Sequence, residues 1–172
     1  MIGPKILVMG VAGCGKSTLA GELARVLSAT LIEGDDHHLP QSQDKMRRGI
    51  PLQDADREPW LGRLGDLLAA EIGPAVLTCS ALKRRYRDRL RWAVPMLRTV
   101  FIEIPLGQSL LRVASRPGHL FPPGLVASQF DALEPPSGEP GVLTVPALAP
   151  LHEQVDGVLR WLDLHHELPQ PT

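Results

Sequence analysis

Apolar residues along this chain follow two alternating patterns. Short continuous apolar runs, which are typical of buried strands, occur at residues 5–9, 29–33, 75–79, 99–104 and 142–145. Between them apolar residues recur every third or fourth position, as in helices that pack on one face, within residues 19–27, 61–72, 106–114, 125–133 and 151–162. The alternation predicts an α/β fold with three layers, α/β/α, in which helices cover both faces of a five-stranded parallel sheet.

The composition is that of an ordinary globular protein. At 172 residues, one domain spanning residues 1–172 is expected. The net charge of −1 and the aromatic content of 4% give no reason to expect a nucleic-acid partner. Apolar runs are all shorter than a membrane span, so no membrane association is expected. The two cysteines, Cys14 and Cys79, do not suggest a disulfide framework, and a cytoplasmic location is expected.

The segment between the first strand and the first helix carries a phosphate-binding motif. Residues 10–17 read GVAGCGKS and fit the pattern G-x-x-x-x-G-K-[ST]. Backbone N–H groups of such a loop cradle phosphate oxygens, and the N-terminus of the following helix adds a partial positive charge. A glycine-rich turn that matches by chance is the alternative. The predicted nucleotide site comprises Gly10, Val11, Ala12, Gly13, Cys14, Gly15, Lys16, Ser17 and Thr18.

Two side chains of this motif carry chemistry. Lys16 would reach the β- and γ-phosphates of ATP, and the Ser17 hydroxyl would ligate Mg²⁺. In many phosphate-loop enzymes a further strand ends in an acidic residue that holds the metal, but the third strand here ends at Cys79. Asp35, after the second strand, is the best replacement and would reach the ion through water.

The second strand leads into Gly34-Asp35-Asp36-His37-His38. Ligands of parallel α/β sheets bind beyond the carboxyl ends of the strands. A carboxylate there can accept a proton from a substrate hydroxyl, and we predict this role for Asp35. For Asp36 and His37 a solvated polar turn is the better interpretation, with Asp36 capping the next helix.

Basic residues near the same sheet edge suggest an anionic substrate. Arg57 lies near the start of a helix for which Asp54 is the expected N-cap. Its guanidinium either pairs with Asp54 or Glu58 or holds a substrate anion. Lys83 is expected in the first turn of the basic helix after Ser80, near the ligand edge. A solvated basic face is expected for Arg84, Arg85, Arg89 and Arg91.

The region after the fourth strand predicts a lid over the phosphates. A helix carrying Arg112 and Arg116 is followed by Pro117-Gly118-His119, and the lid is expected at about residues 116–124. Lid closure excludes water, and a lid arginine stabilises charge during phosphoryl transfer. An ordinary helix-ending loop is the alternative. Residues 146–150 are the candidate contact for the adenine ring.

These motifs, taken in order, resemble those of the gluconokinase family of phosphate-loop kinases, which is related in fold to shikimate kinases. The resemblance covers nearly the whole length. The segment from Lys45 to Leu61 and the run Cys79-Ser80-Ala81-Leu82-Lys83 are more specific than the phosphate loop, which many families share. The matching residues are Gly10–Ser17, Gly34, Asp35, His38, Lys45, Met46, Gly49–Leu52, Asp54, Asp56, Arg57, Pro59–Leu61, Cys79–Lys83, Tyr86–Asp88, Arg112, Arg116, Gly118, His119, Ser128–Phe130, Leu133 and Glu134.

The resemblance implies phosphorylation of D-gluconate at its 6-hydroxyl by ATP with Mg²⁺, in a protein that is commonly a homodimer. Asp35 would then orient or deprotonate the hydroxyl, and Arg116 would be the lid arginine. Arg112 would lie close to the nucleotide. The implied substrate-binding residues are Asp35, His38, Arg57, Ser80, Lys83 and His119.

The chain departs from the family pattern at a few positions. Leu39 and Ser42 replace a usual proline and asparagine near His38, and Leu120 replaces a frequent phenylalanine. Pro146 and Leu148 stand where acidic residues are common. Alternative functions are another phosphate-loop small-molecule kinase, acting on shikimate, a nucleoside monophosphate or another sugar acid, and a nucleotide-dependent regulatory protein. A guanine-reading Asn-Lys-x-Asp segment is absent from the sequence.

Overall fold

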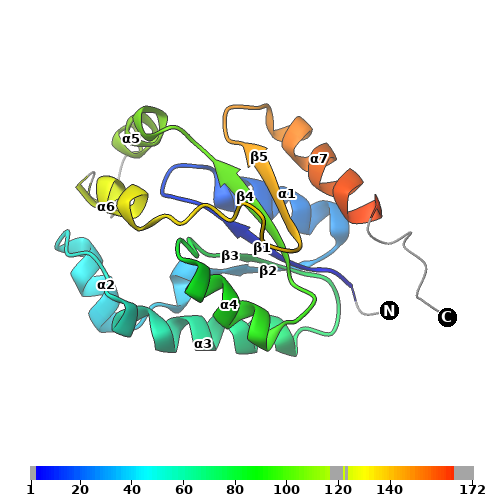
Figure 1. Cartoon of the computed structure of the whole chain (residues 1–172), viewed down its shortest axis with the longest axis horizontal. Coiled ribbons are helices and arrows are strands. Elements are labelled where there is room, and N and C mark those ends of the chain that lie inside the picture. Colours follow the sequence, from blue (N-terminus) through cyan, green and yellow to red (C-terminus); the bar gives the residue numbers. More distant parts are fainter. Residues whose placement is uncertain (1–2, 117–121, 123, 165–172) are drawn as a thin grey trace.

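The computed structural model describes residues 3–116, 122 and 124–164. Its centre is a five-stranded, wholly parallel sheet (Figure 1) with the strand order β2-β3-β1-β4-β5. The strands are β1 (Lys5–Met9), β2 (Thr30–Glu33), β3 (Ala75–Thr78), β4 (Arg98–Glu103) and β5 (Val142–Pro146). The predicted five-stranded parallel sheet is confirmed, with strand ends within about a residue of those expected.

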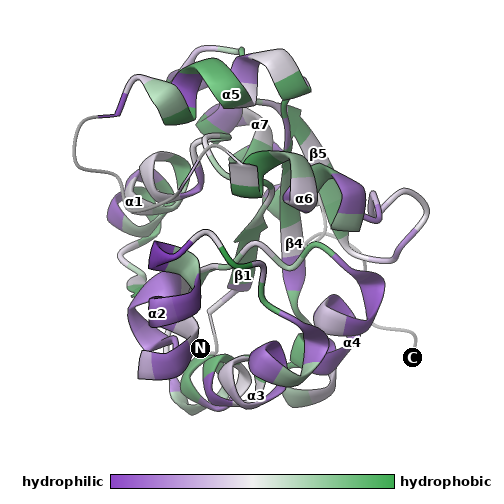
Figure 2. Ribbon diagram, turned by 90° about the vertical axis from the view of Figure 1, so that its left-hand side faces the viewer, coloured by the Kyte–Doolittle hydropathy of each residue, from purple (hydrophilic) through white to green (hydrophobic). Residues whose placement is uncertain are grey.

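Helices cover both faces of the sheet, as the alternating pattern predicts. The helices are α1 (Lys16–Leu27), α2 (Pro40–Arg47), α3 (Asp54–Ala70), α4 (Arg84–Ala93), α5 (Leu106–Ala114), α6 (Gly124–Ala132) and α7 (Leu151–Leu164). A 3-10 turn, η1 (Gly34–His37), follows β2. The sequence pattern did not predict α2, because its residues are nearly all polar (Figure 2) and form no apolar stripe.

The core has two halves because successive side chains of a strand point to opposite faces. Ile6 and Val8 of β1 face α1 and α7, whereas Leu7 and Met9 face α3 and α4. All four side chains are fully buried. The predicted stripes at residues 19–27, 61–72 and 151–162 supply the helical side of these two clusters. No helix within the described ranges is long and apolar enough to cross a membrane.

The start of α3 differs from the prediction that Asp54 caps it. The N-cap is Gln53, and its side chain and that of Asp56 form a reciprocal capping box with each other's backbone N–H. Lys45 of α2 donates to Asp56 Oδ1 at 2.8 Å. Asp54 is therefore the first helical residue, and its carboxylate is available for contacts beyond α3.

A buried arginine ties three segments together on the α4 side. Arg87 is fully buried and donates to the carbonyls of Ala81 (2.8 Å), Leu82 (3.1 Å) and Glu134 (2.9 Å). Its guanidinium also pairs with the Glu139 carboxylate at 2.5 Å, and Arg91 reaches the same carboxylate at 2.6 Å. Arg87 thus fixes both the turn before α4 and the loop between α6 and β5.

We expect Glu139→Gln to destabilise the fold at neutral pH by about 3–5 kcal/mol, because removal of one partner leaves the Arg87 charge buried and uncompensated. Burial alone would raise the pKa of Glu139, but hydrogen bonds from Arg87 and Arg91 outweigh it and hold the pKa below its ordinary value of 4.5. Because the folded pKa is depressed, this stabilisation is present above about pH 4.5 and is lost as pH falls through the folded pKa. Urea unfolding between pH 7 and pH 3 measures it.

The control for this experiment is Glu103→Gln, which changes an exposed glutamate at the end of β4. The gap in stability between the wild type and Glu139→Gln should narrow below about pH 4.5, whereas Glu103→Gln should stay within about 0.5 kcal/mol of the wild type. A Glu139→Gln protein as stable as the wild type at pH 7 would contradict the importance of this ion pair.

Candidate functional site

The phosphate loop joins β1 to α1 at the carboxyl edge of the sheet. Gly15, the N-cap of α1, has φ of 101°, a conformation that favours glycine. The Lys16 ammonium lies over the loop and donates to the carbonyls of Gly10 (3.0 Å) and Val11 (3.1 Å). Helix N–H groups, glycine conformations and a lysine over the loop together form a cradle suited to a polyphosphate.

An acidic side chain lies against the predicted metal ligand. Ser17 Oγ donates to Glu33 Oε2 at 3.1 Å, and Thr78 Oγ1 donates to the same oxygen at 2.6 Å. Glu33 is the last residue of β2, so the carboxyl end of a strand supplies a carboxylate next to the Ser17 hydroxyl. Hydroxyl and carboxylate oxygens are ligands that Mg²⁺ prefers. Sequence reasoning missed Glu33, although its position at a strand end was the available signal.

Beyond Glu33, η1 places Asp35 at the surface and His38 in the interior. The Asp35 side chain is 85% exposed, whereas that of His38 is 3% exposed. His38 Nε2 lies 3.5 Å from Asp35 Oδ1, and the imidazole stacks on the Trp60 ring with centroids 3.9 Å apart. Trp60 Nε1 in turn donates to the Gly34 carbonyl at 2.8 Å. Trp60 and His38 thus support η1 from the protein interior.

Three of the predicted charged groups act on one thiol at the end of β3. The pKa of Cys79 is raised to about 12, mainly by burial; a hydrogen bond with the Ala81 backbone opposes this, and smaller effects come from the Asp35 charge, which raises the pKa, and from the Arg57 and Lys16 charges, which lower it. Asp35 follows β2 and Lys16 lies just after β1, the two strands that flank β3 in the sheet. The structure therefore brings together residues that lie apart in the sequence at the sheet edge where ligands are expected.

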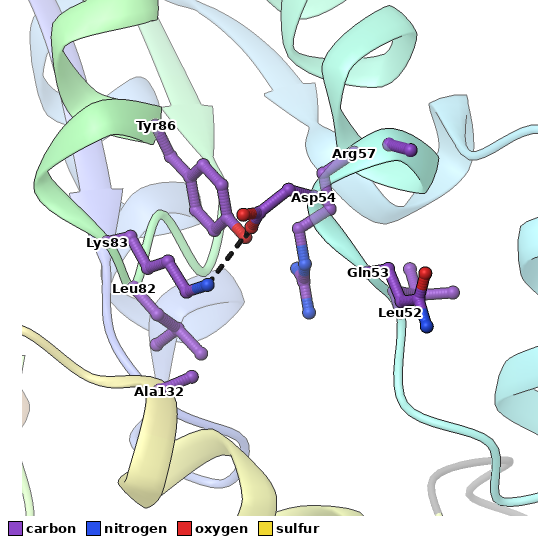
Figure 3. A pocket seen from close by; sticks show the side chains of 9 residues that line it. Leu52, Gln53, Asp54, Arg57, Leu82, Lys83, Tyr86 and Ala132 are labelled. Carbon is purple, nitrogen blue, oxygen red and sulfur yellow. Dashed lines mark hydrogen bonds and ion pairs between the residues drawn. The ribbon is translucent and has the colours of Figure 1, made fainter.

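A cavity of about 430 Å³ lies between the start of α3, the start of α4 and the end of α6. Figure 3 shows the side chains around it, with Asp54 and Arg57 from α3 facing Lys83 and Tyr86. Ser80 and Lys83 belong to the turn between β3 and α4, and Ala81 in this turn has φ of 45°, unusual for a residue with a side chain. The bonds from Arg87 to the carbonyls of Ala81 and Leu82 hold this turn.

Asp54 accepts hydrogen bonds from three of the described side chains at this wall of the cavity. It accepts from Lys83 Nζ at 3.0 Å, from Arg85 Nη1 at 2.8 Å and from the Tyr86 hydroxyl. The hydrogen bond from Tyr86, followed by that from Lys83, lowers the pKa of the Asp54 carboxyl. Conversely, burial and the bond to Asp54 raise the pKa of Tyr86 above its ordinary value.

The contacts of Arg57 separate the two interpretations of this residue. Asp54 is taken by other donors, and Glu58 pairs with Arg89 at 3.3 Å. In the part of the chain that the structure describes, no carboxylate forms an ion pair with Arg57, whose guanidinium lies 5.6 Å from the Tyr86 ring centre. In Figure 3 its side chain extends into the space that the other residues surround. Arg57 is therefore placed to receive an anion.

The basic face expected for α4 is wrong in part. Arg85 and Arg89 pair with carboxylates of α3, and Arg91 is only 16% exposed and pairs with Glu139. Arg84 and Arg85 nevertheless remain largely solvated, with side chains 64% and 63% exposed, so the expectation of a solvated face is wrong for Arg89 and Arg91. The acidic partners come from segments distant in the sequence, which is why the charge pattern of α4 alone did not reveal them.

Arg112 of α5 connects the phosphate loop with the segment after β5. Its Nη1 donates to the Gly13 carbonyl at 3.2 Å, and its Nη2 donates to the Ala147 carbonyl at 3.1 Å. Arg112 thus lies beside the phosphate loop, and its contact with a nucleotide stays a prediction. Arg116 is exposed just beyond α5. The remaining lid prediction, His119 included, falls mainly on residues 117–121 and 123, which lie outside the described residues.

Comparisons with known proteins point in one direction. A family model described as an AAA domain matches residues 6–136. The thermosensitive gluconokinase of Escherichia coli K12 is 41% identical over 142 residues, with 81% of this chain and 76% of the relative covered. A gluconokinase structure from Sinorhizobium meliloti 1021 has 39% identity and a TM-score of 0.87, covering 98% of this chain and 99% of that one. An unliganded sugar kinase from Janibacter sp. HTCC2649 has 34% identity and a TM-score of 0.88, covering 94% and 95%.

We expect Tyr86, the single tyrosine of the chain, to resist ionisation well above pH 10, because both burial and Asp54 raise its pKa. Phenolate absorbance near 295 nm reports on this residue alone. Asp54→Asn should lower the titration midpoint, since it removes the negative charge beside the phenol. Circular dichroism at each pH provides the control for alkaline unfolding. A midpoint near pH 10 in the folded wild type would contradict the observed pairing.

Proposed function

Because this chain belongs to the gluconokinase family, we propose that it transfers the γ-phosphoryl group of ATP to the 6-hydroxyl of D-gluconate. The observation that carries this proposal is Arg57, which forms no ion pair with a carboxylate of the described residues and lines a cavity at the carboxyl edge of the sheet. Gluconate is a small polyol with one carboxylate. The cavity offers a cation for that carboxylate, and Ser80 and Lys83 nearby are candidate partners for its hydroxyls.

The charged groups around the proposed acceptor cavity are already paired with one another, apart from Arg57, within the described residues. Asp54 holds Lys83, Arg85 and Tyr86 at one wall, whereas Arg57 lines the cavity without a carboxylate partner among the described residues. A guanidinium can bind a carboxylate through two parallel hydrogen bonds, which fixes its orientation as well as its position. We therefore assign Arg57 as the main contact of the gluconate carboxylate.

The phosphate loop suits ATP, and the groups beside it suit Mg²⁺. Ser17 would hold the ion directly, and Glu33, which contacts Ser17 Oγ at 3.1 Å, would hold one of its waters. The Asp35 carboxylate, two residues further on, is a second candidate for a water-mediated contact. When bound, the ion offsets the negative charge of the phosphates. Lys16 adds a positive charge to the same region, once phosphate oxygens replace the carbonyls of Gly10 and Val11 that it contacts here.

Asp35 is our candidate for the residue that orients the attacking hydroxyl. Its exposed carboxylate would accept the proton of the gluconate 6-hydroxyl as that oxygen bonds to the γ-phosphorus, and the bond from phosphorus to the leaving oxygen of ADP breaks. His38 was expected near the substrate. Its 3% exposure and its distance of 3.5 Å from Asp35 favour a supporting role, in which the imidazole fixes the carboxylate.

The remaining expectations stay predictions. Arg116 and His119 are proposed to approach the phosphates and the acceptor when both substrates are bound, and Thr18 and residues 146–150 are proposed nucleotide contacts. We also propose a single domain spanning residues 1–172, a homodimer and a cytoplasmic location. Shikimate, nucleoside monophosphates and other sugar acids are the alternative acceptors against which gluconate has to be compared.

We expect the wild-type protein to release ADP from ATP fastest with D-gluconate among a panel of D-gluconate, other sugar acids, shikimate and nucleoside monophosphates, in a coupled assay. Arg57→Ala should raise KM for gluconate at least tenfold, because a charge-assisted bidentate contact contributes more than about 1.4 kcal/mol. KM for ATP should change little. Arg57→Lys should restore part of the affinity, since it keeps the charge but loses the fork.

Arg63→Ala is the matched control, because Arg63 lies on the same helix and is exposed to solvent. It should leave both KM values unchanged. Equal gluconate KM values for the wild type and Arg57→Ala would refute the assignment of Arg57. Preferred turnover of another acceptor would replace gluconate and leave the phosphate-loop chemistry in place.

For Asp35→Asn we expect kcat to fall by about 10²–10⁴-fold, the usual contribution of a positioned general base, with KM for gluconate changed only a few-fold. The melting temperature should stay close to that of the wild type, because the Asp35 side chain is 85% exposed. The neighbouring Asp36→Asn, also exposed, is the control and should keep wild-type turnover. An Asp35→Asn enzyme with more than a tenth of wild-type kcat would exclude the proposed role.

A further inference from the structure

One residue of the phosphate loop, Ala12, is held through both of its backbone polar groups by side chains far away in the sequence. The Ala12 N–H donates to Gln129 Oε1 at 2.7 Å, and the Ala12 carbonyl accepts from Ser109 Oγ at 2.7 Å. Gln129 lies on α6, and Ser109, which is fully buried, lies on α5. Both ends of the residue are therefore engaged by side chains outside the loop.

Hydrogen bonds among the described residues of the loop engage the carbonyls of Gly10 and Val11 but not the polar groups of Ala12 itself. Ala12 lies between Gly10 and Gly13, whose φ angles are 151° and 74°. Glycines on either side give the backbone wide conformational freedom. In phosphate-binding loops the N–H groups generally point inward to the anion, whereas the Ala12 N–H is directed to a carboxamide. Its placement thus depends on α5 and α6.

The helix that carries Gln129 also contacts the acceptor side. Ala132, one turn after Gln129, lines the cavity that contains Arg57. Immediately after α6, Glu134 N–H donates to the Leu82 carbonyl at 2.8 Å, and Arg84 N–H donates to Glu134 Oε2 at 2.8 Å. In Figure 3 the end of α6 with Ala132 lies across the cavity from Arg57 and Asp54. One short helix therefore touches both the phosphate loop and the turn that precedes α4.

We propose that Gln129 and Ser109 are positioning residues for phosphoryl transfer, which fix Ala12 and so set the phosphate loop at the correct distance from the acceptor cavity. This inference rests on the proposed kinase activity. Neither side chain is required to touch a substrate. They act by holding Ala12 in place. Because α6 also lines the acceptor cavity, it links the position of the loop to that of the cavity.

Loss of the hydrogen bonds from Gln129 and Ser109 to Ala12 has a distinctive kinetic consequence. The rest of the loop, Lys16 and Ser17 remain in place, so ATP should still bind. The γ-phosphorus would no longer be held in line with the acceptor hydroxyl, and displacement of a reacting group by about 1 Å can cost about 10²-fold in rate. We therefore expect a fall in kcat rather than in affinity, together with a larger share of ATP that is hydrolysed by water instead of transferred.

The kinetic test compares Gln129→Leu, Ser109→Ala and the double variant. Each single change should lower kcat about tenfold or more, with KM for ATP within about threefold of the wild type. Because both side chains act on one residue, Ala12, the double variant should be scarcely slower than either single variant. The control is Ser128→Ala on the same helix, because Ser128 Oγ bonds only to the Leu125 carbonyl within the described residues. It should keep wild-type kcat.

A second measurement does not depend on the acceptor. Amide hydrogen exchange at Ala12, followed by nuclear magnetic resonance, should be at least about tenfold faster in Gln129→Leu, since the hydrogen bond of that N–H is lost. Gln129→Glu keeps an acceptor oxygen and should retain slow exchange. If Ala12 exchanges faster in Gln129→Leu but the wild type phosphorylates no acceptor of the panel, the role of Gln129 in holding Ala12 is supported and the kinase proposal is rejected. Unchanged Ala12 exchange in Gln129→Leu, or rate losses that multiply in the double variant, would overturn this inference.

Discussion

The buried pairing of Arg87 with Glu139 is the interaction on which the acceptor side of the molecule depends. An arginine without exposed surface is tolerable only when its donors are satisfied, and Arg87 achieves this with three carbonyls and one carboxylate. Its partners belong to the turn after β3, the end of α6 and the loop before β5. The buried cation thus links the apolar turn after β3 to the loop before β5.

Charge pairing also determines which groups face the cavity. The cations Arg57 and Lys83 line it together with Asp54. The Asp54 carboxylate pairs with Lys83 and with Arg85, and Arg57 faces the open space (Figure 3). Under the proposed function, a substrate anion that enters the cavity meets a guanidinium that forms no ion pair within the described residues. Preorganisation of this kind reduces the free-energy cost of binding, because none of the salt bridges described for the cavity wall has to break. The fixed donors around Asp54 also give the wall a defined shape.

The features that could be predicted from the sequence are local ones. The strands, most helices and the phosphate loop follow from spacing within a few residues, and Asp35 follows from its place after a strand. Glu33 was missed because its meaning depends on Ser17 and Thr78, which reach it only in the folded sheet. The surroundings of Arg57 and His38 likewise depend on tertiary contacts: other donors occupy Asp54 beside Arg57, and His38 stacks on Trp60. The structural role of Arg87 could not be predicted from spacing, because its partner Glu139 is 52 positions away.

The long sequence separations of these contacts also affect how the protein folds during its synthesis on the ribosome. The Ala12–Gln129 contact spans 117 positions, and the Arg87–Glu139 contact closes only after most of the chain has been made. A nascent chain therefore displays its phosphate-binding motif long before the helix that contacts it and the loop that pairs with Arg87 have emerged. Such an unfinished chain lacks the contacts that hold Ala12 and the turn before α4, so its phosphate loop and the cavity wall are not yet fixed relative to each other.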